Sequence, residues 1–151
     1  MAGAPLWNAP DIVPSLVYAD VPRAVAWLER VFGFRERAEA RLTWPGGCRA
    51  WMEVGEGLFS LSTPGETWRR PSGPPTGSVM KVYVEDLEGH FARARAEGAT
   101  IVQEPMDGFW GGRIYRALDH GGHAWEISQR NRDLAAEDWD LPPGLSRGVP
   151  K

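Results

Sequence analysis

The sequence has one cysteine, no long apolar run and no excess of basic residues, and each shortage excludes a class of protein. Cys48 has no second cysteine to pair with, which argues against a disulfide-stapled secreted domain and favours a cytoplasmic protein. No stretch approaches the roughly 18 apolar residues of a membrane span, and residues 1–10 lack the features of a signal peptide. A net charge of −3 offers no general attraction for nucleic acid or anionic membranes.

Aromatic residues, in contrast, are plentiful. The chain has eight tryptophans among 151 residues, more than a core of this size needs. Tryptophan usually packs in a core, but it also lines pockets in which a flat ligand stacks. Packing is the expected role of Trp27 and Trp139, whereas Trp51, Trp110 and Trp125 are open to either role.

The chain contains an internal repeat with an offset of 66 residues. Residues 13–20 form an apolar run that ends in aspartate, and residues 79–86 have the same form. Residues 58–62 and 124–128 also correspond at this offset. Because agreement of several elements at one offset is improbable by chance, we interpret the chain as a tandem duplication.

A helix is predicted after the aspartate of each repeat. Asp20 and Asp86 are suited to cap helices over residues 21–32 and 87–97, because a carboxylate accepts hydrogen bonds from the free N–H groups of the first turn. Apolar residues at helical spacing support the first helix. The glycines that follow, Gly33 and Gly98, suit the left-handed conformation that ends a helix.

Short strands separated by glycine turns follow each helix. The predicted strands cover residues 34–44, 49–54 and 58–62 in the first half, and 100–104, 113–118 and 123–128 in the second. The chain therefore divides into a βαβββ module over residues 12–62, a Pro-, Gly- and Ser-rich linker over 63–77, a second βαβββ module over 78–130 and a C-terminal tail over 131–151.

Four segments resemble the vicinal oxygen chelate superfamily of glyoxalases, bleomycin resistance proteins and extradiol dioxygenases. Two are the helix at residues 24–34 and the closing Asp-x-x-Gly-His-x-Trp-Glu at 119–126. The other two, the run from 84 to 119 and the tail at 132–139, are similar to bacterial glyoxalase-like proteins. The resemblance covers about residues 12–139. It implies an α+β fold in which tandem βαβββ modules form a half-open barrel around a cleft, and it implies a homodimer.

The resemblance also locates the metal ligands of the family's enzymes, at positions occupied here by Val13, Ser60, Val79 and Glu126. Valine has no lone pair to donate, serine is a poor ligand, and a lone carboxylate does not hold a divalent ion tightly. We therefore expect neither a metal nor another cofactor, and we do not expect metal-dependent glyoxalase or dioxygenase activity.

The predicted cleft offers aromatic and charged side chains instead. Lys81 and Glu126 either pair with each other or contact the ligand. Phe109 and Trp110 lie in a glycine-flanked loop, which is expected to be a flexible lid over a planar ligand, with a dimer contact as the alternative. The candidate ligand-binding residues are Trp51, Ser60, Lys81, Tyr83, Phe109, Trp110, Tyr115 and Glu126.

The sequence favours a metal-independent binding protein of the bleomycin-resistance type, which sequesters an aromatic or amphipathic small molecule between the modules, as bacterial antibiotic-resistance proteins do. One alternative is a glyoxalase-like lyase or isomerase that uses Glu126 as a catalytic general base. Another is a non-catalytic dimeric scaffold whose cleft is filled by its own side chains. Neither nucleic acid nor membrane is an expected partner.

Overall fold

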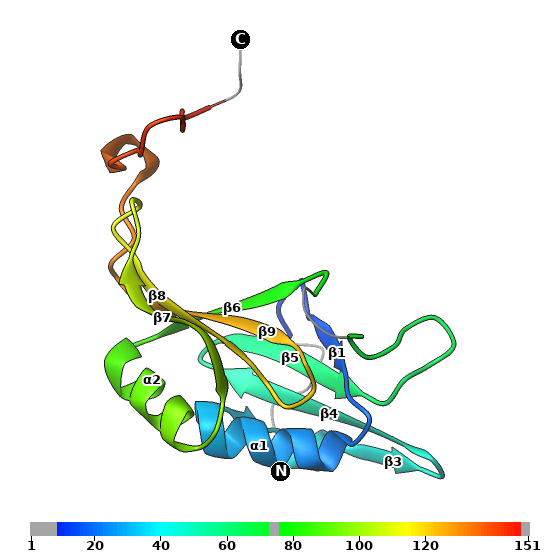
Figure 1. Cartoon of the computed structure of the whole chain (residues 1–151). Coiled ribbons are helices and arrows are strands. Elements are labelled where there is room, and N and C mark those ends of the chain that lie inside the picture. The colour runs from blue at the N-terminus through cyan, green and yellow to red at the C-terminus, as the bar shows by residue number, and fades with distance from the viewer. Residues whose placement is uncertain (1–8, 73–75, 149–151) are drawn as a thin grey trace. The chain divides into compact units, whose positions relative to one another are not determined.

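The computed structural model describes residues 9–72 and 76–148, which form two compact units (Figure 1). Among the described residues, unit 1 contains 9–72 and 76–77 together with the turn Asp119–His123. Unit 2 contains Ser78–Leu118 and residues 124–148. None of the helices in the described ranges has the length and apolar character that a membrane span requires.

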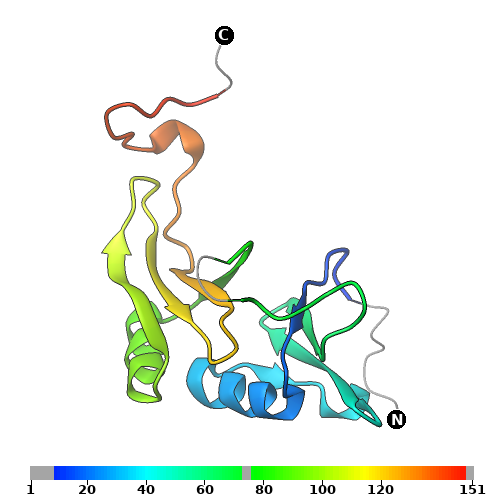
Figure 2. The ribbon, with the colours of Figure 1, turned by 45° about the vertical axis from the view of Figure 1, so that its right-hand side comes forward.

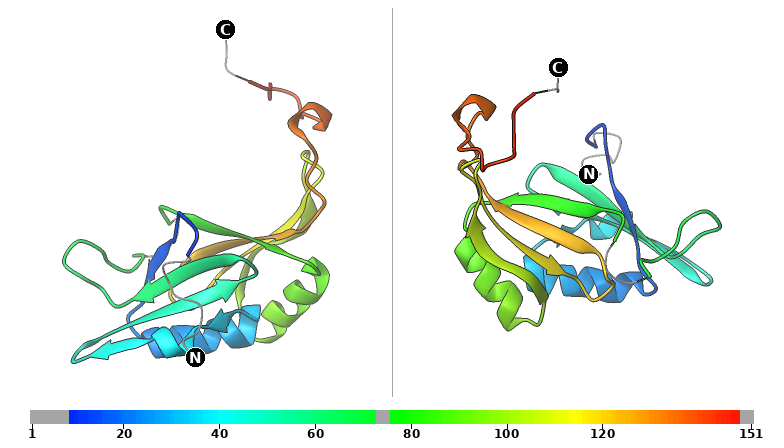
Figure 3. Two further views of the ribbon diagram at one scale, coloured as in Figure 1. Left: turned by 180° about the vertical axis from the view of Figure 1, so that it is seen from behind. Right: turned by 45° about the horizontal axis from the view of Figure 1, so that its top comes forward.

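Unit 1 is an open sheet with one helix across its face (Figure 3). Its strands have the order β1-β5-β4-β2, and β3 also pairs with β4. Only β1 and β5 are parallel. The elements are β1 (Ser15–Val17), α1 (Val21–Phe32), β2 (Arg35–Glu36), the 3₁₀ turn η2 (Ala38–Ala40), β3 (Leu42–Trp44), β4 (Gly47–Val54) and β5 (Gly57–Ser62).

Helix α1 has the boundaries that the sequence predicts. The Asp20 side chain accepts a hydrogen bond from the Arg23 amide at 3.1 Å, and Gly33 ends the helix in the left-handed conformation with φ 74°. The apolar stripe of α1 is buried: Val21, Ala24, Val25, Leu28, Val31 and Phe32. Burial of a large aliphatic or aromatic side chain contributes about 1.5–3 kcal/mol, so this stripe anchors the helix to the sheet.

Unit 2 repeats the arrangement with a four-stranded sheet of order β6-β9-β8-β7, against which α2 lies (Figure 2). Asp86 caps α2 through the Gly89 amide at 3.1 Å. The elements are β6 (Val79–Val84), α2 (Leu87–Ala96), β7 (Thr100–Asp107), β8 (Arg113–Leu118), β9 (Ala124–Gln129) and the 3₁₀ turn η3 (Ala136–Asp138). The protein is therefore α+β, with two βαβββ-like sheets.

The 66-residue repeat is preserved in the strand register. In unit 1, Ser15 of β1 lies opposite Ser60 of β5 in a parallel pair. In unit 2, Lys81 of β6 lies opposite Glu126 of β9 in the equivalent parallel pair. Two serines in one sheet thus correspond to a lysine and a glutamate in the other, so only unit 2 carries charges at these positions.

Two strands differ from the prediction. The segment 34–44 is not one strand, because η2 separates β2 from β3, and Arg41 reaches back across this turn to Glu36 with two hydrogen bonds of 2.7 and 2.8 Å. Strand β7 continues past its predicted end to Asp107. Its pairing with β8 shifts register between Gln103 and Met106, around Pro105, whose lack of an N–H group suits such an irregularity.

A buried polar network within unit 1 holds the turn Asp119–His123. The Tyr18 hydroxyl donates to Asp119 Oδ2 at 2.5 Å, and Asp119 Oδ1 accepts from the amides of Gly121 and His123 at 2.9 and 3.0 Å. His123 Nε2 donates to the Val17 carbonyl at 2.8 Å. Burial, and then the Asp119 carboxylate, raise the pKa of Tyr18, so its hydroxyl remains a donor.

Candidate functional site

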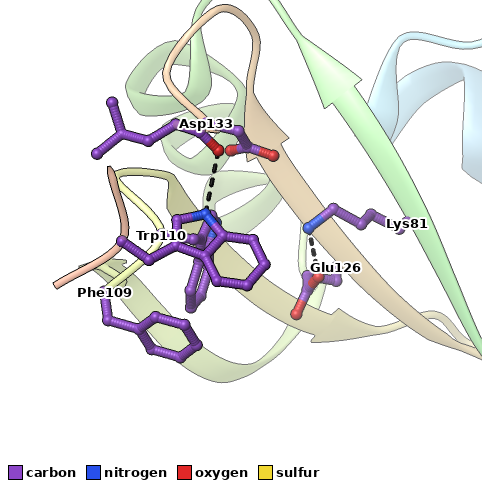
Figure 4. A pocket seen from close by; sticks show the side chains of 7 residues that line it. Lys81, Phe109, Trp110, Glu126 and Asp133 are labelled. Carbon is purple, nitrogen blue, oxygen red and sulfur yellow. Dashed lines mark hydrogen bonds and ion pairs between the residues drawn. The ribbon is translucent and has the colours of Figure 1, made fainter. Parts of the chain in front are cut away.

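Unit 2 contains an open pocket of about 310 Å³ (Figure 4). This volume is at the small end of the usual range for small-molecule sites. The residues come from β6, β9, the turn between β7 and β8, and the tail after β9. They are Lys81, Phe109, Trp110, Glu126, Asp133, Leu134 and Trp139.

A line of three charges crosses the sheet beside the pocket. Glu126 lies on β9, between Lys81 on β6 and Arg116 on β8, and both are its direct cross-strand neighbours. Lys81 Nζ lies 3.0 Å from Glu126 Oε2, and Arg116 Nη2 lies 2.8 Å from Glu126 Oε1. Lys81 and Glu126 therefore pair with each other, which is one of the two arrangements that the sequence predicts (Figure 4).

Lys81 and Arg116 lower the pKa of Glu126. Burial alone would raise the pKa of this carboxyl group, but hydrogen bonds and charge attraction from Lys81 and Arg116 outweigh burial, and the pKa is lowered. Glu126 is therefore ionised at neutral pH. A carboxylate with a lowered pKa is also a weak base.

Replacement of Glu126 by glutamine is expected to lower the free energy of unfolding at pH 7 by about 1 kcal/mol, because two cations lose their shared partner. Glu126 has a lowered pKa in the folded state, so its stabilisation is present above its unfolded pKa of about 4.3 and is lost as pH falls through the lowered value. Urea unfolding of both proteins from pH 7 to 3 measures this difference.

The matched control is Glu88→Gln. Glu88 also pairs with an arginine, Arg113, but its side chain is 60% exposed, and we expect almost no change in stability. A loss for Glu126→Gln that is equally large at pH 3 and pH 7 would contradict the ionic explanation.

The aromatic side of the pocket comes from the turn between β7 and β8. Phe109 and Trp110 pack edge to face with centroids 5.2 Å apart. The Trp110 ring lies directly on the backbone of two glycines, because a Cβ atom at Gly108 or Gly112 would come within 2.2 or 2.1 Å of that ring. Glycine at these two positions therefore lets the indole lie flat along the turn.

The C-terminal tail holds this turn in place. Leu134 donates its amide to the Trp110 carbonyl at 2.8 Å, and Asp140 donates to the Phe109 carbonyl at 3.1 Å. The Trp139 ring meets the edge of Phe109 at 5.9 Å. Figures 2 and 3 show the tail running beside the hairpin of β7 and β8. The sequence predicts a flexible lid here, whereas the structure shows a turn bound to a second segment.

Tyr83 connects the tail to the sheet. Its hydroxyl donates to Asp133 Oδ2 at 2.6 Å, and this hydrogen bond is the main cause that raises the pKa of Tyr83. Lys81 Nζ lies 5.4 Å from the Tyr83 ring centroid and 5.9 Å from that of Trp110. The ammonium group thus lies near two aromatic rings while it pairs with Glu126.

The structure brings together four of the predicted ligand-binding residues in this pocket: Lys81, Phe109, Trp110 and Glu126. Trp51 and Ser60 are cross-strand neighbours in the sheet of unit 1. Tyr115 is fully buried on the α2 side of the unit 2 sheet, where its hydroxyl lies 2.6 Å from His90 Nδ1. It is therefore outside the pocket.

Sequence reasoning missed four residues that belong to the site. Arg116 could have been predicted from the sequence, because side-chain alternation along β8 and its pairing with β9 place Arg116 on the same face as Glu126. Asp133, Leu134 and Trp139 lie in a tail without helical or strand periodicity, so no pattern places them near the turn of Phe109 and Trp110.

The positions of the family's metal ligands do not form a metal site in the described ranges. Val13 precedes β1, Ser60 is buried in β5, and the Val79 side chain is apolar and exposed. Across residues 9–72 and 76–148, no three histidine, cysteine, aspartate or glutamate side chains gather as metal ligands would. Among these four positions, Glu126 alone has a side chain that is a good metal ligand, and its carboxylate is paired with two cations.

Comparison with known proteins identifies the family and supports the fold. The model of the "Glyoxalase/Bleomycin resistance protein/Dioxygenase superfamily" matches residues 12–127. The crystal structure of TioX from Micromonospora sp. ML1 is similar with a TM-score of 0.66 and 37% identity, over 80% of this chain and 98% of TioX. A glyoxalase/bleomycin resistance protein/dioxygenase from Nocardioides has 21% identity, covers 91% of this chain and 90% of its own, and shares the fold with a TM-score of 0.59.

Among curated sequences, an uncharacterised protein of Mycobacterium bovis is 32% identical over 63 residues, which is 42% of this chain. The matched region spans 41% of that relative's length.

Proposed function

We propose that this chain, which belongs to the glyoxalase/bleomycin resistance protein/dioxygenase superfamily, is a small-molecule binding protein that sequesters a planar aromatic or amphipathic compound without a metal. The binding site we propose is the pocket of unit 2. The single observation that carries the proposal is this pocket of about 310 Å³, walled by Phe109, Trp110 and Trp139.

The composition of the pocket supports binding of a flat ligand. Small-molecule sites combine apolar and aromatic walls with a few polar groups that set orientation. Phe109 is 36% exposed even though it packs against two tryptophans, so aromatic surface remains accessible for stacking. Lys81 and Glu126 supply the polar groups at the sheet end of the pocket.

The rival function is a glyoxalase-like lyase or isomerase with Glu126 as general base. A general base works best when its pKa lies near the operating pH, which requires a carboxyl pKa well above its normal range. The cations Lys81 and Arg116 instead lower the pKa of Glu126. This electrostatic setting disfavours proton abstraction and suits a fixed charge that orients other groups.

Trp110→Ala tests the proposal. A thermal-shift screen of planar aromatic compounds against the full chain is expected to find ligands that raise the melting temperature. At a hundred times the dissociation constant, the gain is about 2.7 kcal/mol, or roughly 5–10 °C. The Trp110→Ala protein is expected to bind the same compounds at least about tenfold more weakly, because a stacking wall is lost.

Trp44→Ala is the matched control, since Trp44 is 45% exposed on β3 of unit 1 and lies outside the pocket. It should bind like the parent protein. Failure of every planar aromatic compound to stabilise the parent, or equal binding by parent and Trp110→Ala, would refute the proposed site.

A further inference from the structure

We propose that the ligand of the unit 2 pocket is a planar aromatic acid whose carboxylate is bound by Lys81. This inference rests on the proposed function and adds to it the sign of the ligand's charge and the residue that recognises it. Two observations lead to it: the engagement of the carboxylates and the position of the lysine ammonium.

The carboxylate oxygens that line the pocket are largely occupied. Glu126 Oε2 accepts from Lys81 and Glu126 Oε1 accepts from Arg116. Asp133 Oδ2 accepts from the Tyr83 hydroxyl. Glu126 therefore has little acceptor capacity left for a cationic or donor-rich ligand, and the remaining capacity lies mainly on Asp133 Oδ1.

Donor capacity, in contrast, is left over. Lys81 has three N–H donors, and the hydrogen bond to Glu126 uses one of them. The Lys81 side chain is 38% exposed, so its ammonium group can be reached from the pocket. Acceptor groups on a ligand would complement this surplus of donors.

The place that a ligand cation would take is already filled. Aromatic cages bind ammonium ligands over ring faces within about 6 Å of the centroids. Here the Lys81 ammonium lies at 5.4 Å from Tyr83 and 5.9 Å from Trp110. A second cation would meet repulsion from Lys81 and Arg116, and a carboxylate would meet attraction from both, whereas Glu126 and Asp133 act on each in the opposite sense. Because Glu126 is paired with the two cations and Asp133 accepts from Tyr83, the preference for an acid rests on the remaining donors of the Lys81 ammonium group. The ring system of the acid would stack against Phe109, Trp110 or Trp139.

Calorimetric titration of the full chain with three ligands of one shape tests the inference. The ligands are naphthalene-2-carboxylate, the neutral naphthalene-2-carboxamide and the cationic 2-naphthylmethylammonium, at pH 7 and low ionic strength. The carboxylate is expected to bind about tenfold more tightly than the amide, because a charge-assisted hydrogen bond is stronger than a neutral one. The ammonium compound is expected to bind most weakly.

Lys81→Met removes the charge but keeps an unbranched side chain, and Glu126 retains Arg116 as a partner. This variant should lose the preference for the carboxylate while its affinity for the amide stays within about twofold. Arg130→Met is the control, because Arg130 is a cation near Tyr83 that does not line the pocket, and it should keep the preference.

The outcomes distinguish a wrong inference about the acid from a wrong binding site. If all three naphthalenes bind equally, if the ammonium compound binds best, or if Lys81→Met keeps the preference, the inference about the acid is wrong while the binding site stands. If none of the three binds to the parent protein, both the inference and the proposed pocket are contradicted.

Discussion

Replacement of Asp119 by alanine is expected to lower the free energy of unfolding by about 3–4 kcal/mol, the largest loss predicted for a single substitution in this protein. The Asp119 side chain is buried and accepts three hydrogen bonds, from the Tyr18 hydroxyl and from the amides of Gly121 and His123. Alanine would leave the Tyr18 hydroxyl and the His123 amide buried without an acceptor, and the Gly121 amide partly buried without one. Each buried group of this kind costs about 1–3 kcal/mol. Urea unfolding followed by circular dichroism measures the change.

Two milder variants give the order of effects that this explanation requires. Asp119→Asn keeps an oxygen for the two turn amides, and Tyr18→Phe removes only the hydroxyl donor. Each is expected to cost about 1–2 kcal/mol. If Asp119→Ala is no more destabilising than Tyr18→Phe, the turn is not held through the carboxyl group and the explanation is wrong.

Removal of the C-terminal tail from Arg132 onward is expected to abolish ligand binding while the fold remains intact. The tail supplies Asp133, Leu134 and Trp139 to the pocket, and its backbone binds the turn of Phe109 and Trp110. No described residue beyond Arg130 is fully buried. The melting temperature should therefore fall by no more than about 4 °C, roughly 1 kcal/mol for a chain of this length.

A shorter deletion provides the control. A protein that ends at Pro142 keeps every tail residue that lines the pocket, and also keeps the bond from Asp140 to Phe109. It should bind planar ligands as the full chain does. Equal binding by the protein cut before Arg132 would contradict a role of the tail, and collapse of its melting temperature would contradict the separation of site from fold.

Most of the fold could be predicted from the sequence because the governing patterns are local and occur twice. Asp20 and Asp86 mark the helix starts, and the 66-residue offset predicts equivalent strand pairs, which the register of Ser15 with Ser60 and Lys81 with Glu126 confirms. The prediction missed the 3₁₀ turn η2 because strand and turn signals compete within a few residues there, and the contact of Arg41 with Glu36 across the turn is not visible in a local pattern.

The candidate site was harder to predict because it joins segments distant in the chain. Strand alternation predicts only which face Lys81 and Glu126 occupy; the expectation that they share a cleft also rests on the family resemblance and the 66-residue offset, and the register of β6 with β9 pairs them. The tail, however, contacts the β7–β8 turn through backbone hydrogen bonds to Phe109 and Trp110. Any residue type can form a backbone hydrogen bond, so the sequence does not predict this contact. Trp139 illustrates the difficulty. The usual role of tryptophan favours a core position for it, whereas the structure places it in the pocket wall.

The position of Tyr115 depends on a choice that alternation alone leaves open. Strand periodicity fixes which residues share a face, but it does not say which face the helix covers. The pairing of Tyr115 with Ile127 and of Arg116 with Glu126 assigns the tyrosine to the α2 side and the arginine to the pocket side.

The central claim is that a small planar molecule binds in the pocket of unit 2, and the indole N–H signals of the tryptophans test it most directly. In ¹H–¹⁵N spectra of the full chain, titration with naphthalene-2-carboxylate is predicted to shift the signals of Trp110 and Trp139, which line the pocket. The signal of Trp125, which is fully buried, should stay in place. Shifts confined to Trp51 of unit 1, or no indole shift at a saturating concentration of this acid, would contradict the claim.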